Sequence, residues 1–246
     1  MLNREDKMIS QTDARKFLQE MARIYRRAHK PGHRKVESRV IRGRAQCVAA
    51  EFEDELADLI CRKVLWSKEE NIHVFTDFPI TIKPAHDMCS TQETRYVDIL
   101  VCSKRSGRNY DVLYMAELKT NTGWMREKVD SYLQDNRELI RHLKLSTTVV
   151  SARSASLAAS YLDAKYAQSN FRVSNEIRYD LIVLSSTNND SDSLNDLKND
   201  NDELSALIIL TDESVGGRHK KGYKPIPRFG DFREFDLRIR KCLGHV

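Results

Sequence analysis

The chain has 246 residues, enough for one sizeable domain, since domains usually hold about 100 to 200 residues. Apolar residues make up 40% of it and charged residues 31%, a composition that excludes wholesale disorder. The longest apolar runs, such as residues 206–210, fall far short of the ~20 residues of a membrane span, and the first ten residues lack the apolar core of a signal peptide. We therefore expect a cytoplasmic protein without a membrane partner.

Charge is distributed unevenly behind a net value of +5. Residues 1–44 hold thirteen Lys or Arg against five Asp or Glu, and residues 215–241 hold nine against three. The segment 187–203 is the opposite, with six acids and one lysine. Basic regions concentrate polyanions around a protein, so nucleic acid is the leading class of partner.

Two amphipathic helices are predicted in the first quarter of the chain. Thr12 is the expected cap of a helix that runs to about Lys30, where Pro31 and Gly32 end it. A second helix is predicted over residues 45–65. The apolar faces repeat every three to four residues and comprise Phe17, Met21, Ile24 and Tyr25 in the first helix and Val48, Phe52, Leu56, Leu59 and Ile60 in the second.

The following elements predict an α/β fold. Three strands are expected at 72–82, 95–103 and 110–120, the last two joined by a turn about residues 106–109. After them come helices at 126–145 and 155–167, a strand at 179–185, an acidic loop at 187–203, a strand at 204–211 and a helix at 231–243. We expect a central mixed sheet flanked by helices in one domain, 45–246, preceded by a basic helical extension, 1–44.

Ionisable residues interrupt the two strands of the predicted hairpin. Asp98 lies in an otherwise apolar run, and Glu117 and Lys119 point to the same face because side chains alternate along a strand. In a hairpin symmetric about residues 107 and 108, paired residue numbers sum to 215, which sets Asp98 opposite Glu117 and Tyr96 opposite Lys119. Two facing carboxylates repel unless a cation lies between them, so the pattern predicts a divalent-metal site beside an ammonium. Solvated acids at strand ends, with Lys119 as a salt-bridge partner, are the alternative.

The spacing D-x18-E-x-K, formed by Asp98, Glu117 and Lys119, resembles the signature of the PD-(D/E)XK, or restriction-endonuclease-like, nuclease superfamily. Val97 stands where the signature has proline. The predicted order of helix, three strands, helix and strand over residues 45–185 is also similar to the αβββαβ core of that superfamily. The resemblance implies a metal-dependent endodeoxyribonuclease of the restriction or phage-defence type, acting on DNA, with a homodimer as an open possibility.

The same resemblance implies the roles of the site residues. Mg²⁺, for which Mn²⁺ can substitute, would be held by Asp98, Glu117, the Leu118 carbonyl and Glu53. Lys119 would position the attacking water or stabilise the charge that develops on the phosphate. The catalytic set would also include an acid from the second helix and a polar residue from the helix after the hairpin.

The choice of the helix acid rests on the helical wheel and on the resemblance. Glu53 and Glu55 flank the buried stripe, whereas Glu51 lies further toward solvent. The segment 51–60 is similar to a helix of methylation-dependent restriction enzymes that retains the glutamate after the phenylalanine. This favours Glu53, then Glu55, although an ordinary acidic helix face remains the alternative for each. Gln134 is the candidate from the later helix.

Other chemistries have less support in the sequence. The five cysteines, at positions 47, 61, 89, 102 and 242, include no C-x-x-C pair, and the histidines form no zinc-binding set. The glycine-bearing basic segment 216–222 does not follow the order of a phosphate-binding Walker loop. Two alternatives stay open: a non-catalytic nucleic-acid-binding subunit that retains the nuclease fold, and a nuclease of RNA or of branched or single-stranded DNA.

Overall fold

The computed structural model describes residues 8–30, 35–37, 40–41, 43–65, 71–84, 93–121, 129–144, 148–152, 170–187, 191–199, 202–216 and 223–244. The predicted helix at 155–167 and residues 217–222 of the basic segment lie outside these residues.

The first helix, α1 (Gln11–Ala28), begins slightly earlier than predicted. Ser10, and not Thr12, is its N-cap. The Ser10 hydroxyl accepts a hydrogen bond from the Asp13 N–H at 3.1 Å, and the Asp13 carboxylate accepts one from the Ser10 N–H at 3.1 Å. Thr12 cannot cap because it already lies in the first helical turn. The predicted apolar face of α1 is confirmed, since Phe17, Met21 and Ile24 are all buried.

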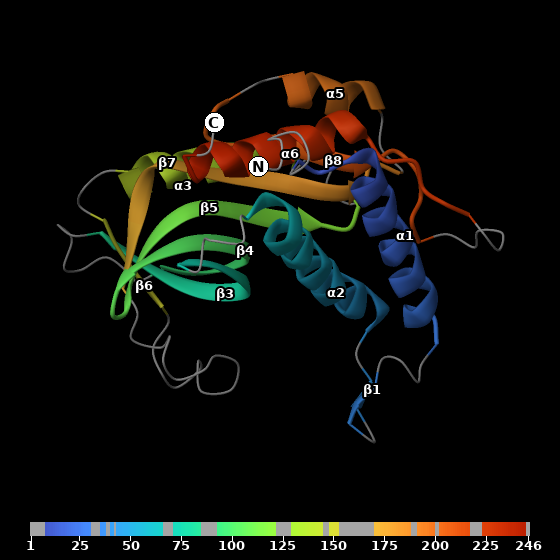
Figure 1. Cartoon of the computed structure of the whole chain (residues 1–246), viewed down its shortest axis with the longest axis horizontal. Coiled ribbons are helices and arrows are strands. Elements are labelled where there is room, and N and C mark those ends of the chain that lie inside the picture. The colour runs from blue at the N-terminus through green and yellow to red at the C-terminus, as the bar shows by residue number, and fades with distance from the viewer. Residues whose placement is uncertain are drawn as a thin grey trace, which may run out of the picture.

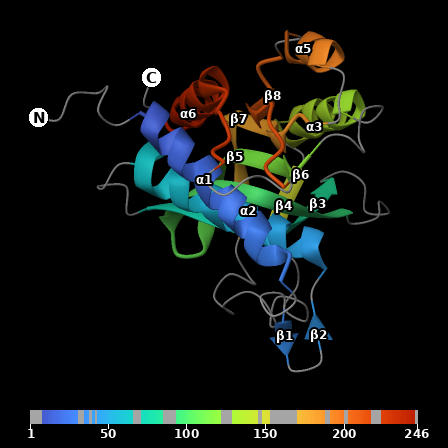
Figure 2. The same cartoon turned by 90° about the vertical axis from the view of Figure 1, so that its right-hand side faces the viewer.

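Helix α2 (Arg44–Leu59) continues into a π-helical turn, Ile60–Val64, and packs beside α1. The ring centroids of Phe17 and Phe52 lie 6.1 Å apart, and the Phe17 ring also contacts Phe232 of the last helix at 5.8 Å. The short strands β1 (Lys35–Glu37) and β2 (Val40–Ile41), which were not predicted, pair with each other and project away from the body of the protein (Figure 2).

In the described part of the chain, six strands form one mixed sheet: β3 (Ile72–Pro84), β4 (Glu93–Ser106), β5 (Asn109–Lys119), β6 (Thr148–Ala152), β7 (Asn170–Ser185) and β8 (Leu207–Thr211). Strands β3, β4 and β5 are antiparallel neighbours, and β5, β7 and β8 follow as parallel neighbours. Strand β6 pairs with β3 and also with the start of β7, so the sheet curls at that end.

Helices cover both faces of this sheet, which makes the protein an α/β fold as predicted (Figure 1). On one face, α1, α2 and α6 (Phe229–Cys242) share a core with the apolar side chains of β4, β5, β7 and β8. On the other face, α3 (Val129–Lys144) and α5 (Ser191–Asn199) pack against β7 and β8. Helix α1 therefore contributes directly to the main core.

Three predicted assignments need correction. The acidic segment 187–203 is not a loop throughout, because α5 forms within it: Leu194 and Leu197, three residues apart, pack on the sheet. Strand β6 was not predicted. Strand β7 begins nine residues before the predicted strand at 179–185, in a stretch where the apolar residues Phe171, Val173 and Ile177 are separated by polar ones.

The predicted hairpin of β4 and β5 is confirmed together with its register. Ser106 pairs with Asn109 around a two-residue turn, where Gly107 adopts a φ of 57°, and Ile99 pairs with Ala116. Both pairs satisfy the predicted sum of 215, although two bulges shift the register between them. Among the described residues, Ile99 with Ala116 is the pair nearest to Asp98 and Glu117, and the predicted pairs of Asp98 with Glu117 and of Tyr96 with Lys119 lie just beyond it.

The described cysteines, Cys47, Cys61, Cys102 and Cys242, are free thiols. Among the described residues, we find no helix with both the length and the apolar character that a membrane crossing needs.

Candidate functional site

Asp98 and Glu117 lie close together near the ends of β4 and β5. The Leu118 N–H donates a hydrogen bond to Asp98 Oδ2 at 2.6 Å, which draws the Asp98 carboxylate toward the backbone beside Glu117. Burial, and after it the charge of Glu117, raise the pKa of Asp98 to about 6 against the opposing effect of the Leu118 N–H. The two predicted carboxylates thus interact electrostatically.

Lys119 completes the predicted triad on β5. Its ammonium donates a hydrogen bond to Glu117 Oε1, as expected of two residues on the same face of a strand. Burial disfavours the charged form of Lys119, but the hydrogen bond to Glu117 and the charges of Glu117 and Asp98 outweigh it and raise the pKa. Lys119 is therefore a stable cation, suited to stabilising negative charge.

Helix α2 directs two of its glutamates to different places. Burial, and after it the charges of Asp98, Asp77, Asp54 and Glu117, raise the pKa of Glu53 to about 8, so Glu53 lies within electrostatic reach of the acids of the sheet. Glu55 lines a groove of about 460 Å³ between α1 and α2. Burial raises its pKa too, but the neighbouring charges are those of other helix residues, beginning with Glu20 and Asp58.

The remaining candidates lie at the surface. Glu51 is exposed and forms an ion pair with Arg27 of α1 at 3.8 Å. Gln134 is exposed on α3, where its amide donates a hydrogen bond to Glu138 one turn later at 2.6 Å. Glu53 thus lies within electrostatic reach of Asp98 and Glu117, whereas the contact described for Gln134 stays within its own helix.

Asp77 of β3 is an acid that the sequence reasoning missed. Its charge raises the pKa of both Asp98 and Glu53, and its position faces Asp98 between the strand pairs Thr76 with Ile99 and Phe78 with Val97. Asp77 has a φ of 44°, the only positive value of a non-glycine residue in the described ranges. A left-handed residue of this kind is uncommon and often accompanies a functional site.

The backbone at Asp77 also breaks the alternation of the strands. Phe75 and Phe78 pack in the same core cluster with ring centroids 4.7 Å apart, although three residues separate them in sequence. Their partners on β4, Leu100 and Val97, share that cluster as well. Asp77 and Asp98 therefore lie at neighbouring positions of β3 and β4 where both strands are irregular. A single acid in an apolar run was the only sequence signal for Asp77.

Two tyrosines contact the triad and were also missed. The Lys119 ammonium lies 5.4 Å from the ring centroid of Tyr132 on α3. The hydroxyl of Tyr179, a buried residue of β7, lies 3.5 Å from Glu117 Oε2. Both come from elements that follow the hairpin by many residues, so no local pattern could reveal them.

The donor set suits a hard divalent cation. Magnesium is usually held by one or two carboxylates together with waters and substrate phosphates, and Asp98 and Glu117 provide two carboxylates beside a third from Glu53. Within the described ranges, no group of three or more His, Cys, Asp or Glu side chains is gathered tightly enough to hold a metal by itself. The mutual repulsion of these carboxylates is what a bound cation would relieve.

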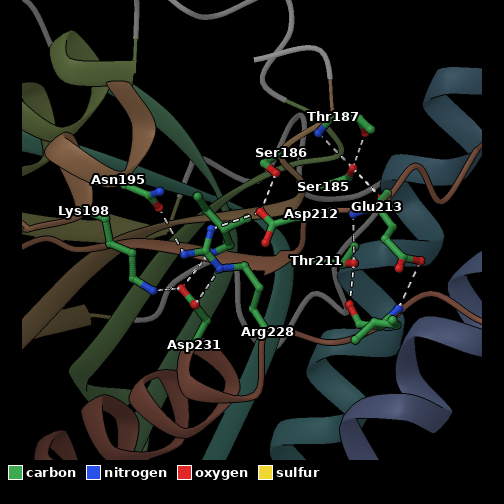
Figure 3. Close-up of polar contacts among 12 residues, drawn as sticks. Ser185, Ser186, Thr187, Asn195, Lys198, Thr211, Asp212, Glu213, Arg228 and Asp231 are labelled. Atoms are coloured by element: carbon green, nitrogen blue, oxygen red, sulfur yellow. Dashed lines mark hydrogen bonds and ion pairs between the residues drawn. The ribbon is translucent and has the colours of Figure 1, made fainter. Parts of the chain in front are cut away.

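A second polar cluster lies at the carboxyl ends of β7 and β8 (Figure 3). Arg228, just before α6, donates hydrogen bonds to Asp212 and Asp231 at 3.1 Å and to Asn195 of α5 at 3.3 Å. Asp231 also accepts from Lys198 and from the backbone N–H of Ile209 at 3.0 Å. These hydrogen bonds connect α5, β8 and α6, so the cluster has a structural role.

The chain was compared with family models, with curated proteins and with solved structures, and none of the three comparisons gave a match.

Proposed function

We propose that the protein is a metal-dependent endodeoxyribonuclease of the PD-(D/E)XK type. The observation that carries the proposal is the convergence of Asp98, Glu117 and Lys119, with Glu53 of α2 facing the same acids. The order of α2, β3, β4, β5, α3 and β7 supports it, because this is the order of the αβββαβ core, with the short strand β6 as an additional element between α3 and β7.

In this proposal Asp98, Glu117, the Leu118 carbonyl and Glu53 hold Mg²⁺ or Mn²⁺. Such an ion, when bound, lowers the pKa of a water and stabilises charge on the scissile phosphate. The chain itself contributes the orientation of the ligands: the Leu118 N–H fixes Asp98, and Lys119 fixes Glu117.

Lys119 assists the reaction as a cation and hydrogen-bond donor. Since it remains an ammonium, it donates hydrogen bonds to the attacking water or to a phosphate oxygen, and its charge favours the more negative transition state. Glu53, with a pKa of about 8, carries a proton at neutral pH when no cation is present and loses it when it becomes a ligand.

DNA is the proposed substrate because the surface of α1 suits a polyanion. The helix buries its apolar face. Between residues 11 and 30, every exposed lysine, arginine, aspartate or glutamate is a basic residue: Arg15, Lys16, Arg23, Arg26, Arg27 and Lys30. Arg23 and Arg27 are paired with Glu20. The others are available to phosphates, which fix position without identifying bases.

The testing experiment incubates the full chain with supercoiled plasmid, linear duplex DNA and RNA, each with Mg²⁺, Mn²⁺ or EDTA. We expect nicking or linearisation of the plasmid with either metal and none with EDTA. Degradation of RNA alone, or from DNA ends alone, would correct the substrate. Binding without cleavage under every condition would contradict the proposal and favour a non-catalytic subunit.

A further inference from the structure

Two of the three charged groups of the candidate triad, Lys119 and Glu117, each contact a tyrosine. The Lys119 ammonium contacts the ring of Tyr132 on α3, and Glu117 Oε2 faces the hydroxyl of Tyr179 on β7. Neither tyrosine belongs to the Asp98, Glu117 and Lys119 triad. Both lie in elements that follow the β4–β5 hairpin in the chain, Tyr132 in α3 and Tyr179 in β7.

The Tyr132 contact is that of a cation over an aromatic ring. At 5.4 Å, the Lys119 nitrogen lies within the distance of about 6 Å at which the negative ring face attracts a cation. Tyr132 is half-buried and packs on the apolar cluster that includes Val129 and Val183, and Val183 is the β7 partner of Lys119. The ring is therefore anchored in the core and is not a loosely held surface group.

Tyr179 contacts Glu117, the residue to which Lys119 is hydrogen-bonded. Tyr179 is 3% exposed, so its ring position is fixed by the core. Its hydroxyl lies 3.5 Å from Glu117 Oε2, while Lys119 donates to Oε1 of the same carboxylate. The two oxygens of Glu117 thus have separate donors, which fixes the plane of the carboxylate.

We propose that Tyr132 and Tyr179 are positioning residues of this site: the Tyr132 ring holds the Lys119 ammonium, and the Tyr179 hydroxyl holds the Glu117 carboxylate. The inference rests on the proposed function for its kinetic consequences. Its physical content is independent of activity. Because Glu117 would also be a ligand of the proposed metal ion, the uncharged Tyr132 ring would hold the Lys119 ammonium in place independently of that carboxylate.

The first test compares Tyr132→Leu, which keeps an apolar side chain, with Tyr132→Phe, which keeps the ring. Because the ring contact serves the transition state, Tyr132→Leu should lower kcat about tenfold with KM for DNA nearly unchanged, and Tyr132→Phe should stay within about twofold of wild type. Tyr223→Phe, which loses a tyrosine-to-glutamate hydrogen bond elsewhere, is the matched control. Equal effects of the Leu and Phe variants would overturn the role of the ring.

A second readout does not need activity. In lysine-labelled protein, the Lys119 Cε protons should be shifted upfield by the ring, with the signal assigned by its loss in Lys119→Ala. The shift should persist in Tyr132→Phe and vanish in Tyr132→Leu. If wild type shows the shift but cleaves no nucleic acid, the proposed function fails while the ring contact stands. If wild type lacks the shift, the contact itself is wrong.

The third test concerns Tyr179→Phe, which removes one buried hydroxyl and leaves the ring. Calorimetric titration of the DNA-free protein with Mg²⁺ should show affinity several-fold weaker than wild type, since Glu117 loses a fixed orientation. Thermal unfolding and the Tyr223→Phe variant monitor general destabilisation. Unchanged Mg²⁺ affinity in Tyr179→Phe would contradict the assignment of the hydroxyl.

Discussion

The acids of the candidate site are expensive to bury together, and their pKa values show it. Burial and neighbouring carboxylates raise the pKa of Asp98 to about 6 and that of Glu53 to about 8. A folded protein normally avoids such repulsion or compensates it with a cation. The consequence is a stability that depends on pH when no cation is bound.

Substituting Glu53→Gln should reveal this dependence. The raised pKa means that the protonated form of Glu53 favours the folded state below about pH 4.5, and this contribution is lost as the pH rises through about 8. Glu53→Gln should therefore match wild type near pH 4 and be about 1–2 kcal/mol more stable near pH 9, after allowance for solvent screening. Urea unfolding at both pH values, without divalent cations, measures the difference in the free energy of unfolding, with Glu51→Gln as the control. Equal differences at both pH values would contradict the buried-acid interpretation.

The affinity for Mg²⁺ should rise with pH, whereas the stability of the metal-free protein should fall. Below pH 6 to 8 the cation must displace protons from Asp98 and Glu53, so its apparent affinity should fall by about tenfold per pH unit for each proton released. Calorimetry at pH 5.5 and 8.5, in buffers with different ionisation enthalpies, counts the protons. Affinity that does not change with pH would mean that these carboxyls are not ligands.

At the residue scale, sequence reasoning worked where a residue violated a local pattern. Asp98, Glu117 and Lys119 stand out because ionisable residues interrupt apolar strands. Glu53 and Glu55 both flank the apolar stripe of α2, so the wheel alone could not separate them; the packing of α1 against α2 takes Glu55 into their groove. Tyr132 and Tyr179 violate no pattern, since partly polar aromatic residues are ordinary in a helix and a strand.

Among the elements, α1 combines a structural face with a basic face, and the two can be tested apart. If exposed cations of α1 bind phosphates, the triple substitution of Arg15, Arg26 and Lys30 by Ala should weaken DNA binding nearly equally for all sequences. The slope of log affinity against log salt should flatten by about 0.9 for each phosphate interaction that the substitutions remove. An unchanged slope would mean that α1 does not bind the DNA backbone.

Phe17→Ala tests the other face of the same helix. Phe17 is 5% exposed and contacts the rings of Phe52 and Phe232, so its truncation leaves a cavity between α1, α2 and α6. We expect a loss of about 3–5 kcal/mol in the free energy of unfolding, with the salt slope of the folded protein unchanged. A loss below about 1 kcal/mol would mean that α1 is an appendage and not part of the core.

Elements with a strong period were predictable, and weakly apolar ones were not. Helix α2 follows its period closely. The β4–β5 hairpin was predictable as a hairpin, and the register derived from its turn holds at Ser106–Asn109 and at Ile99–Ala116 but not between the two bulges. Helix α5 was hidden by its acids, because two leucines suffice to dock a short helix on an already formed sheet. Strand β6 and the beginning of β7 pair with strands distant in sequence, so their extension depends on the tertiary fold.

For the molecule as a whole, the sheet topology explains why the site forms where it does. Glu117 and Lys119 lie at the carboxyl end of β5, next to β7 and β8, which run parallel to it. Helix α2, which carries Glu53, covers one face of the sheet, whereas α3, which carries Tyr132, covers the other (Figures 1 and 2). The edge where parallel strands end is a common location for binding sites in α/β proteins.

The central claim is that Asp98 performs chemistry and not DNA binding. The most direct measurement compares Mg²⁺-dependent nicking of supercoiled plasmid by wild type, Asp98→Asn and the control Glu55→Gln, at DNA occupancies matched by a binding assay. Asn retains an oxygen acceptor for the Leu118 N–H while removing the charge. The account predicts no detectable nicking by Asp98→Asn, DNA affinity within a few-fold of wild type, and full activity of Glu55→Gln. Nicking by Asp98→Asn at the wild-type rate, or an equal loss of binding and cleavage, would contradict it.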